Sequence, residues 1–423
     1  ARQSRLDFRG VVMRECKIVS RKFEIPNSHT LAVAKAHGAY EAMQMMKEYS
    51  PLEIIQIIKD ANLRGKGGGG ASAGEKWELM PQNSEKPSFL AVNCDESEPG
   101  TFKDRQIISK DPHLLIEGIL LTCYAIKAKH AYIYVRGEYK QYQDVLQNAI
   151  DEAYDAGLLK ECDVTIHRGA GAYICGEKTA LLESMEGKRG HPRLKPKQKE
   201  PEWFFGNPTL VNNVETIASV PFIVQNGAEA YREYGTEKSP GTLLFAMSGH
   251  VNKPGVYEAE FGTSMMEYIN HYGGGIKNGK KLKALIPGGV SCGVLTAAEC
   301  ENLTLDYEAL RNARSSLGTG GMIVMDEDTN MVEALKNILE FYHEESCGQC
   351  TPCREGTGWS DKLVGKILDK KATKEDLDKL LEIADTMNGK TICVFAPAVS
   401  AVIVSFVGKF RGEFEAVVSE SKE

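Results

Sequence analysis

The sequence predicts an α/β domain built on a parallel sheet, then a small α+β domain, then a C-terminal helical bundle. Short apolar strands alternate with amphipathic helices between residues 89 and 166, which is the pattern of a parallel sheet covered by helices. Strand and turn signals dominate from Gly241 to Met325, and apolar residues repeat at helical spacing from Asn330 onward. These changes predict four segments: a helical lead-in (1–60), the α/β domain (61–238), the α+β domain (239–329) and the bundle (330–423).

The lead-in is predicted to be helical from the spacing of its apolar residues. Ala39, Ala42, Met43 and Met46 follow the i, i+3, i+4, i+7 pattern of one helix face. A glycine-rich tract, Gly65 to Gly74, then separates the lead-in from the first strand signal.

The α/β domain is predicted from five elements in a row. Asp111 is a side-chain N-cap with Pro112 in the first turn of a helix, and Gly157 can close the next helix. The expected elements are a strand at 89–92, a helix from 112 to about 127, a strand at 131–135, a helix through 145–153 and a strand at 164–166.

The α+β domain and the bundle follow from turn and capping signals. Lys253-Pro254-Gly255 is a turn between the apolar runs 243–247 and 256–257, which predicts a hairpin, and a short helix is expected from about Met265. In the bundle, Thr373 and Asp376 resemble a capping box, and Pro397 lies near the start of a further helix. Two stripes of apolar residues predict the first two bundle helices: Met331, Leu335, Ile338, Leu339 and Tyr342, then Trp359, Leu363 and Ile367.

Composition excludes some classes of function. Lys and Arg total 51 against 58 Asp and Glu, so the formal charge of -7 gives no electrostatic case for nucleic-acid binding. The first twenty residues lack the apolar core of a secretion signal, and we expect a cytosolic protein. The apolar stretch 394–407 is too short to span a bilayer and is expected to be a buried helix.

The strongest chemical signal is a group of cysteines. Two residues separate Cys347 from Cys350, and two separate Cys350 from Cys353. Cys393 is a distant fourth cysteine. Three closely spaced thiolates with a remote one are typical of an iron–sulfur cluster, whereas zinc sites more often use two separated pairs. A zinc site that only staples the bundle is the alternative. The other seven cysteines are expected to be small buried side chains.

The glycine-rich tract and two later loops predict a ligand site. Glycines let backbone N–H groups approach a phosphate, and Lys66 and Lys76 add positive charge, although a flexible linker explains the tract equally well. Polar loops follow the first and third predicted strands, at 93–105 and 168–177. Because ligands bind at the carboxyl ends of parallel strands, these loops favour a site over solvated turns.

These residues together resemble a known family. From about Pro51 to Val407 the chain is similar to the flavin- and NADH-binding subunit of bacterial respiratory complex I and to its relatives in NAD-linked hydrogenases and formate dehydrogenases. The motifs that carry the resemblance are Leu63-Arg64-Gly65, 93–105, 169–177, 187–193, Val211 to Thr216, and the four cysteines.

The resemblance implies a Rossmann-like FMN domain, a ubiquitin-like α+β domain and a four-helix bundle that carries a [4Fe–4S] cluster on Cys347, Cys350, Cys353 and Cys393. It implies Glu98 and Glu177 as the residues that act in the reaction. The residues it places around FMN and the donor are Gly65, Lys66, Gly67, Lys76, Asn93, Asp95, Glu96, Ser97, Tyr173, Gly176, Glu177, Lys178, Asn212, Asn213 and Thr216.

The implied function is electron input. A flavin-dependent NAD(P)H dehydrogenase subunit would pass electrons singly from FMN to the cluster, with NADH as donor. The implied partners are a thioredoxin-like [2Fe–2S] subunit and a multi-cluster iron–sulfur subunit, in a complex on the cytoplasmic side of the inner membrane. No nucleic acid and no membrane span of the chain's own are expected.

The sequence departs from the family around the donor. Ala71, Leu79 and Gln198 stand where the family has aromatic residues that stack on adenine, and Lys178 replaces an acid near the ribose. Drift is one explanation, with Trp203, Phe204 or Phe205 restoring the stacking. The alternative is a donor other than NADH, either NADPH or a small acidic electron-carrier protein. A diaphorase subunit of a soluble hydrogenase and a scaffold without activity also stay open.

Overall fold

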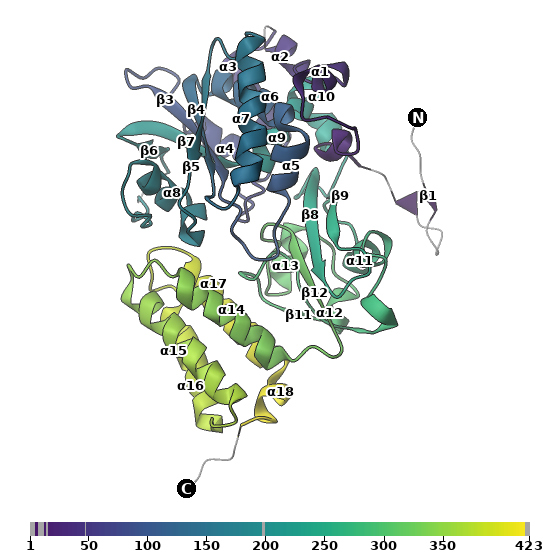
Figure 1. The fold of residues 1–423 in the computed structure, drawn as a ribbon, viewed down its shortest axis with the longest axis vertical. Helices are drawn as coiled ribbons and strands as arrows, with labels where there is room; N and C mark the ends of the chain where they lie inside the picture. The colour runs from purple at the N-terminus through teal and green to yellow at the C-terminus, as the bar shows by residue number, and fades with distance from the viewer. Residues whose placement is uncertain (1–4, 7–11, 14–15, 47, 197–198, 419–423) are drawn as a thin grey trace.

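The computed structural model describes residues 5–6, 12–13, 16–46, 48–196 and 199–418 and contains two five-stranded sheets. In Figure 1 the first sheet lies above the C-terminal helices and the second lies to the right. Among these residues no helix or strand crosses the boundaries expected at 60, 238 and 329.

The first sheet has the order β5-β4-β3-β7-β6. Its strands are β3 (Ser88–Cys94), β4 (Ala128–Val135), β5 (Asp163–Arg168), β6 (Glu202–Phe204) and β7 (Asn207–Asn213). Neighbouring strands from β5 to β7 are parallel, and only β6 runs antiparallel to its neighbour. The predicted parallel sheet is confirmed, but the sequence analysis missed β6 and β7. β7 lacks the usual sequence pattern of a strand, because it contains Pro208 and ends in the polar residues Asn212 and Asn213.

The helices of this domain cover the sheet (Figure 1). They are α5 (Asp104–Lys110), α6 (Pro112–Ala125), α7 (Lys140–Asp155), α8 (Lys178–Met185), α9 (Val214–Ala218) and α10 (Val220–Arg232). Asp111 caps α6 by accepting the backbone N–H of Leu114 at 3.2 Å, as predicted. Gly157 follows α7 with φ of 68°, a left-handed conformation that glycine adopts without strain.

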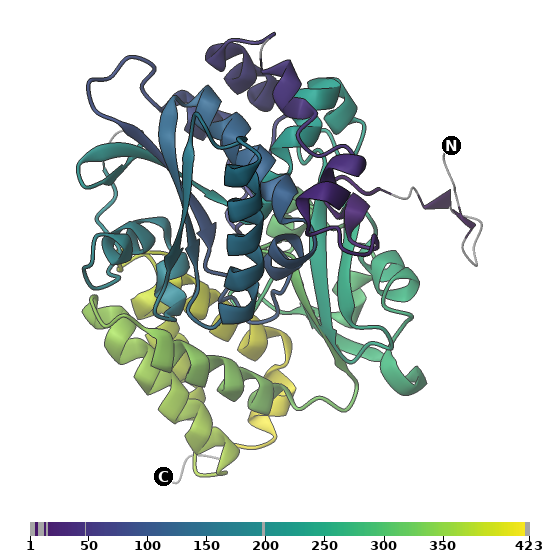
Figure 2. The same cartoon turned by 45° about the horizontal axis from the view of Figure 1, so that its top comes forward.

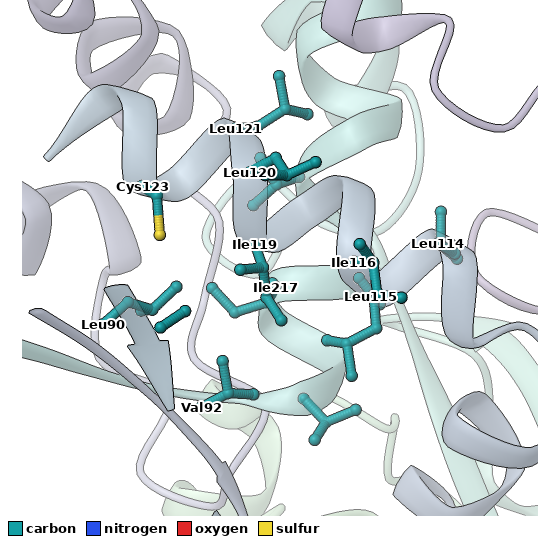
Figure 3. Packing of buried hydrophobic residues seen from close by; sticks show 14 of the residues in the cluster. Leu90, Val92, Leu114, Leu115, Ile116, Ile119, Leu120, Leu121, Cys123 and Ile217 are labelled. Atoms are coloured by element: carbon teal, nitrogen blue, oxygen red, sulfur yellow. The ribbon is translucent and has the colours of Figure 1, made fainter. Parts of the chain in front are cut away.

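The core of the domain lies between α6 and the sheet. Figure 3 shows leucines and isoleucines of α6 packed toward Leu90 and Val92 of β3, with Ile217 of α9 beside them. Gly118 allows this close packing, because a Cβ atom there would lie 2.2 Å from the carbonyl oxygen of Ile217.

The lead-in is helical but broken into short pieces. Its elements are the strand pair β1 (Arg5–Leu6) and β2 (Val12–Met13), then α1 (Leu31–Ala36), α2 (Ala42–Met45) and α3 (Pro51–Asp60). The short helix α4 (Ala73–Glu78) follows the glycine-rich tract and already belongs to the next segment. The stripe from Ala39 to Met46 does not form one helix, because Tyr40 adopts φ of 69° and α2 starts only at Ala42.

The second sheet has the order β11-β10-β12-β8-β9. Its strands are β8 (Thr242–Gly249), β9 (Gly255–Glu260), β10 (Leu282–Ile286), β11 (Leu295–Thr296) and β12 (Gly321–Asp326), with the helices α11 (Met265–His271), α12 (Ala297–Cys300) and α13 (Tyr307–Asn312). The predicted hairpin is β8 with β9, and the predicted short helix is α11. Both predictions are confirmed.

The C-terminal helices are α14 (Met331–Glu345), α15 (Thr351–Leu368), α16 (Lys374–Met387), α17 (Phe395–Lys409) and α18 (Arg411–Glu415). Thr373 and Asp376 form the predicted capping box of α16, and α17 is the buried helix expected at 394–407. Figure 2 shows this bundle lying against one end of the first sheet. Within the described residues, none of the helices is both long and apolar enough to cross a membrane.

Candidate functional site

A cavity of about 530 Å³ opens where the two sheets and the bundle meet. The parallel register pairs Asn93 of β3 with Asn213 of β7, which brings the carboxyl ends of both strands to its wall. The loop after β5 and the start of α17 supply the opposite walls. Eleven of the predicted site residues line the cavity: Gly67, Asn93, Asp95, Glu96, Ser97, Glu98, Tyr173, Gly176, Glu177, Asn213 and the cluster ligand Cys393.

The other residues predicted around FMN and the donor do not line the cavity. The amide oxygen of Asn212 accepts from the indole N–H of Trp77 at 3.0 Å, and the hydroxyl of Thr216 accepts the backbone N–H of Lys66 at 2.9 Å. The carbonyl oxygen of Gly65 accepts a hydrogen bond from the hydroxyl group of Tyr307. Lys76 donates to the carbonyl of Val211 at 2.8 Å. Their assignment to a ligand stays a prediction.

Lys66 and Lys178, both predicted from charge, have protein partners. The ammonium of Lys66 is fully buried and bonds to Ser219 and Glu215 rather than lining the cavity. Lys178 forms an ion pair with Glu202 of β6, so the added base is neutralised within the chain. Gln198, another departure from the family, lies outside the described residues.

The cavity wall also contains residues that were not named one by one from the sequence, although five of them lie in the glycine-rich tract and the two polar loops predicted to form the site. They include Gly68, Gly69, Thr101, Asp104, Ile174, Ser291, Ser316, Gly318, Thr319, Val394, Phe395, Pro397 and Ala398. Asp104 lies inside the loop that was singled out, so its position was available from the sequence. Ser291 and Thr319 come from loops beside the strands of the second sheet, and only the fold reveals that they reach the cavity.

The glycine tract forms a tight turn on the cavity wall. A Cβ atom at Gly67 would lie 3.0 Å from Cβ of Asn213, and Gly68 has φ of 114°, a conformation that disfavours side chains. Because a turn of glycines has no side chains, a ligand in the cavity can come close to its backbone N–H groups. Such N–H groups are suited to bind a phosphate group.

The charge of the wall is acidic. Asp95, Glu96, Glu98, Asp104 and Glu177 line the cavity, and no Lys, Arg or His from the described ranges does so. Burial raises the pKa of Asp95 to about 7, although hydrogen bonding from Ser97 opposes the shift. Asp104 is paired with Lys103 at 2.7 Å and Glu96 with Arg105 at 3.3 Å, both cations lying outside the cavity lining. The other wall carboxylates can accept hydrogen bonds from the hydroxyl groups of a ligand.

Glu98 and Glu177 are both held in place. Tyr173 donates its hydroxyl to Glu98 at 2.6 Å, and the backbone N–H of Ser291 donates to the other carboxylate oxygen at 2.7 Å. Burial raises the pKa of Glu98, against these two hydrogen bonds. Glu177 caps α8 by accepting the N–H groups of Thr179 and Ala180, each at 2.9 Å.

The four predicted cysteine ligands line one small second pocket. Cys347, Cys350, Cys353 and Cys393 reach it from the start of α15 and the loop before α17. The backbone N–H of Ile392 donates to the sulfur of Cys350 at 3.3 Å, the kind of contact that stabilises a thiolate. The side chains of the described residues contain no group of three or more His, Cys, Asp or Glu that could hold a metal ion as they stand.

The two pockets share a wall. Ile174, Cys393 and Phe395 line both the large cavity and the cysteine pocket. The ring of Phe395 also meets the ring of Tyr173 at 5.7 Å between centroids. The other seven cysteines are all buried, as predicted.

Three protein families match different parts of the chain. The Nuo51 FMN-binding domain matches residues 58–222, the SLBB domain matches 243–324, and the iron–sulfur binding region of NADH-ubiquinone oxidoreductase F matches 333–417.

Similar proteins extend over nearly the full chain. The F subunit of NADH-quinone oxidoreductase in Rickettsia massiliae is 46% identical over 398 residues, which is 92% of this chain and 94% of the relative. The protein of the same name in Mycobacterium bovis is 44% identical over 416 residues, covering 95% and 93% of the two chains. Among solved structures, an NAD⁺-reducing [NiFe]-hydrogenase in the air-oxidised state is similar with a TM-score of 0.86 and 32% identity, over 98% of this chain and 70% of that chain.

Proposed function

The chain belongs to the family of the NADH-quinone oxidoreductase F subunits, and from this premise we propose that it takes two electrons from a nicotinamide donor onto FMN and passes them singly to a [4Fe–4S] cluster. FMN, when bound, supplies the exchange between two-electron and one-electron chemistry. The observation that carries the proposal is the wall of Ile174, Cys393 and Phe395, which the flavin cavity and the cysteine pocket have in common.

The residues of the chain have distinct roles in this proposal. The turn at Gly67 to Gly69 offers backbone N–H groups to the phosphate, and the cavity carboxylates accept from hydroxyl groups. Glu98, with Tyr173, holds a proton at the cavity wall. Ile174 and Phe395 exclude water from the space between the two pockets, and the four thiolates hold the cluster.

The residues fit both cofactors. The cavity of about 530 Å³ lies in the range of small-molecule sites, and one glycine turn at its wall leaves the backbone free to approach a ligand. Four cysteines at a single pocket supply the sulfur ligands that iron–sulfur clusters use.

The direct test is the cofactor content of the purified chain and its reduction by NADH without oxygen. We expect one FMN and four iron atoms per chain and bleaching of the flavin absorbance by NADH. A folded protein that binds iron but no flavin would contradict the proposal and favour a scaffold.

We also propose the four-part division at residues 60, 238 and 329, which the absence of elements across these boundaries in the described residues supports. The chain is a subunit of a larger complex. We propose that its partners are a thioredoxin-like [2Fe–2S] subunit and a multi-cluster iron–sulfur subunit, on the cytoplasmic side of the inner membrane. This chain covers nearly the whole length of the F subunits but a smaller share of the hydrogenase chain. The difference favours a complex of the NADH-quinone oxidoreductase type over a soluble hydrogenase.

We propose NADH rather than NADPH as the donor, because Lys178 is already paired with Glu202 and the cavity wall is acidic. Replacing Glu202 with glutamine leaves Lys178 without its carboxylate, and the free ammonium can then attract an extra phosphate. The kcat/KM for NADPH should rise by roughly threefold while that for NADH changes little, the size expected when one partly exposed charge is released. Steady-state kinetics with both donors measure this.

Glu200→Gln is the matched control, because Glu200 is an exposed acid of the same segment. A wild-type protein that prefers NADPH would contradict NADH as the donor. Equal responses to both glutamine variants would contradict the role given to the Lys178–Glu202 pair.

Lys76 predicts how flavin binding depends on pH. Burial lowers the pKa of Lys76 to about 8, with a further lowering from the nearby Lys178. The ammonium is charged below that pH and neutral above it, so attraction to the flavin phosphate is lost as the pH rises. We expect the Kd for FMN to increase above pH 8 in the wild type and to stay flat to about pH 10 in Lys76→Arg, because arginine keeps its charge. Fluorescence titration of the apoprotein measures both curves, and parallel curves would remove Lys76 from the phosphate site.

A further inference from the structure

Four buried charges form a chain behind the glycine turn. The ammonium of Lys66 lies 3.3 Å from one oxygen of Glu215, and the ammonium of Lys103 lies 2.8 Å from the other oxygen. Lys103 also contacts Asp104 at 2.7 Å. The exposed fraction of these side chains is 0% for the first three and 4% for Asp104.

The chain of charges ends at the cavity through Asp104 and Asn213, which both line the wall. The amide nitrogen of Asn213 donates to Asp104 at 2.6 Å. The amide oxygen of Asn213 accepts the backbone N–H of Glu215 at 2.9 Å and faces Lys103 at 3.5 Å. These contacts fix which side of the Asn213 amide is nitrogen and which is oxygen.

The same contacts support the glycine turn. The turn packs on Asn213, because a Cβ atom at Gly67 would meet Cβ of Asn213 at 3.0 Å. The backbone N–H of Asp104 is in turn held by Glu96 at 2.7 Å. Asn213 and Asp104 therefore transmit the geometry of the buried charges to the cavity wall.

The chain pairs two lysines with two carboxylates, and burial lowers the pKa of Lys66 while Glu215 opposes that shift. Removing one of these four groups leaves an uncompensated charge in a region without water, where electrostatic fields act over longer distances than in solvent. Burial alone lowers the pKa of Lys103, yet Asp104 and Glu215 hold it above the ordinary value, so this lysine is charged. Burial raises the pKa of Asp104 to about 6, opposed by Lys103, which leaves Asp104 mostly anionic at neutral pH.

We propose that Asp104 and Lys103 are positioning residues for the flavin, which orient Asn213 under the glycine turn and set the charge that the flavin faces. This inference rests on the proposed function, because it requires FMN in the cavity. Neither residue was among those expected from the sequence to act on the cofactor.

The test is a redox titration of the flavin with dithionite and mediator dyes in the full chain. Asp104→Asn removes a negative charge at the wall, which favours the electron-rich reduced flavin. At a fixed potential we expect the ratio of reduced to oxidised flavin to rise about tenfold, equivalent to about 30 mV for a two-electron couple. Lys103→Met should shift the ratio in the opposite direction, and the double variant should return it to within about threefold of the wild type, because neutral pairs restore the balance.

Asp111→Asn is the matched control. Asp111 is a buried aspartate paired with Lys22 at 3.0 Å, and it does not line the cavity. The control should leave the potential unchanged. The inference would be overturned if the flavin potential shifted by the same amount in Asp111→Asn and Asp104→Asn. It would also be overturned if the Asp104 and Lys103 variants both had the wild-type potential.

A variant that fails to hold flavin is also informative. If Asp104→Asn folds but loses FMN, recovery of binding in Asp104→Glu supports the positioning role, and no recovery overturns it. If Asp104→Asn does not fold, the double variant decides: a potential near the wild-type value supports the inference, and a shifted one overturns it. Because dithionite replaces the nicotinamide donor, failure here is distinct from failure of the proposed function, which would appear as a wild-type protein without flavin or without NADH reduction.

Discussion

Replacing Cys350 with alanine should abolish the iron–sulfur signal in electron paramagnetic resonance while FMN stays bound. Cys350 is one of four thiols at the small pocket, and without it one iron has no protein ligand, so we expect the cluster to be lost. The flavin cavity shares only Ile174, Cys393 and Phe395 with that pocket, so its other walls stay intact. NADH should still bleach the flavin, with no electron appearing on a cluster.

Cys300→Ala is the control for this experiment, because Cys300 is fully buried in the core of the second sheet and does not line the pocket. It should keep both the iron content and the signal. If Cys350→Ala loses flavin and secondary structure together with iron, the cluster is part of the structural core, since metal binding and folding are then coupled.

Replacing Gly67 with valine should remove FMN. The Cβ atom alone would approach Asn213 to 3.0 Å, and the two further methyl groups of valine would occupy the wall where the phosphate is expected. We expect the Kd for FMN to rise by at least roughly a hundredfold, which is about 2.7 kcal/mol of binding free energy. Titration of the apoprotein with FMN, followed by flavin fluorescence, measures the change.

Gly408→Val supplies the comparison. Gly408 lies on α17, and a Cβ atom there would meet nothing within 4 Å. The variant should bind FMN as the wild type does. Flavin binding by Gly67→Val with unchanged Kd would show that the phosphate does not approach the glycine turn.

The sequence alone was sufficient for features that depend on local spacing. The strands at 89–92, 131–135 and 164–166 and the cap at Asp111 all follow from neighbouring residues. Three of the four cysteines at the small pocket are also close in the sequence, and the fold brings the distant Cys393 to them. The loops after β3 and β5 meet at one cavity because parallel strands end at the same edge of the sheet.

Features that depend on tertiary contacts could not be predicted in this way. Lys66 is flanked by glycines in the sequence, which predicted that its ammonium binds a phosphate. In the folded chain the ammonium instead forms an ion pair with the buried carboxylate of Glu215. Ser291 and Thr319 reach the cavity from loops beside the second sheet, a contact with no signal in either segment. The helix break at Tyr40 shows the limit of the apolar pattern. The spacing of apolar residues predicts which side chains share a buried face, but it does not predict whether the backbone is one continuous helix.

The most direct test of electron transfer between flavin and cluster is rapid freezing of the purified chain after anaerobic mixing with NADH. Loss of flavin absorbance should be accompanied by a [4Fe–4S] resonance in the same sample, and that resonance should be missing in Cys350→Ala. Flavin that is fully reduced by NADH beside a cluster that only dithionite can reduce would contradict transfer across the wall of Ile174, Cys393 and Phe395.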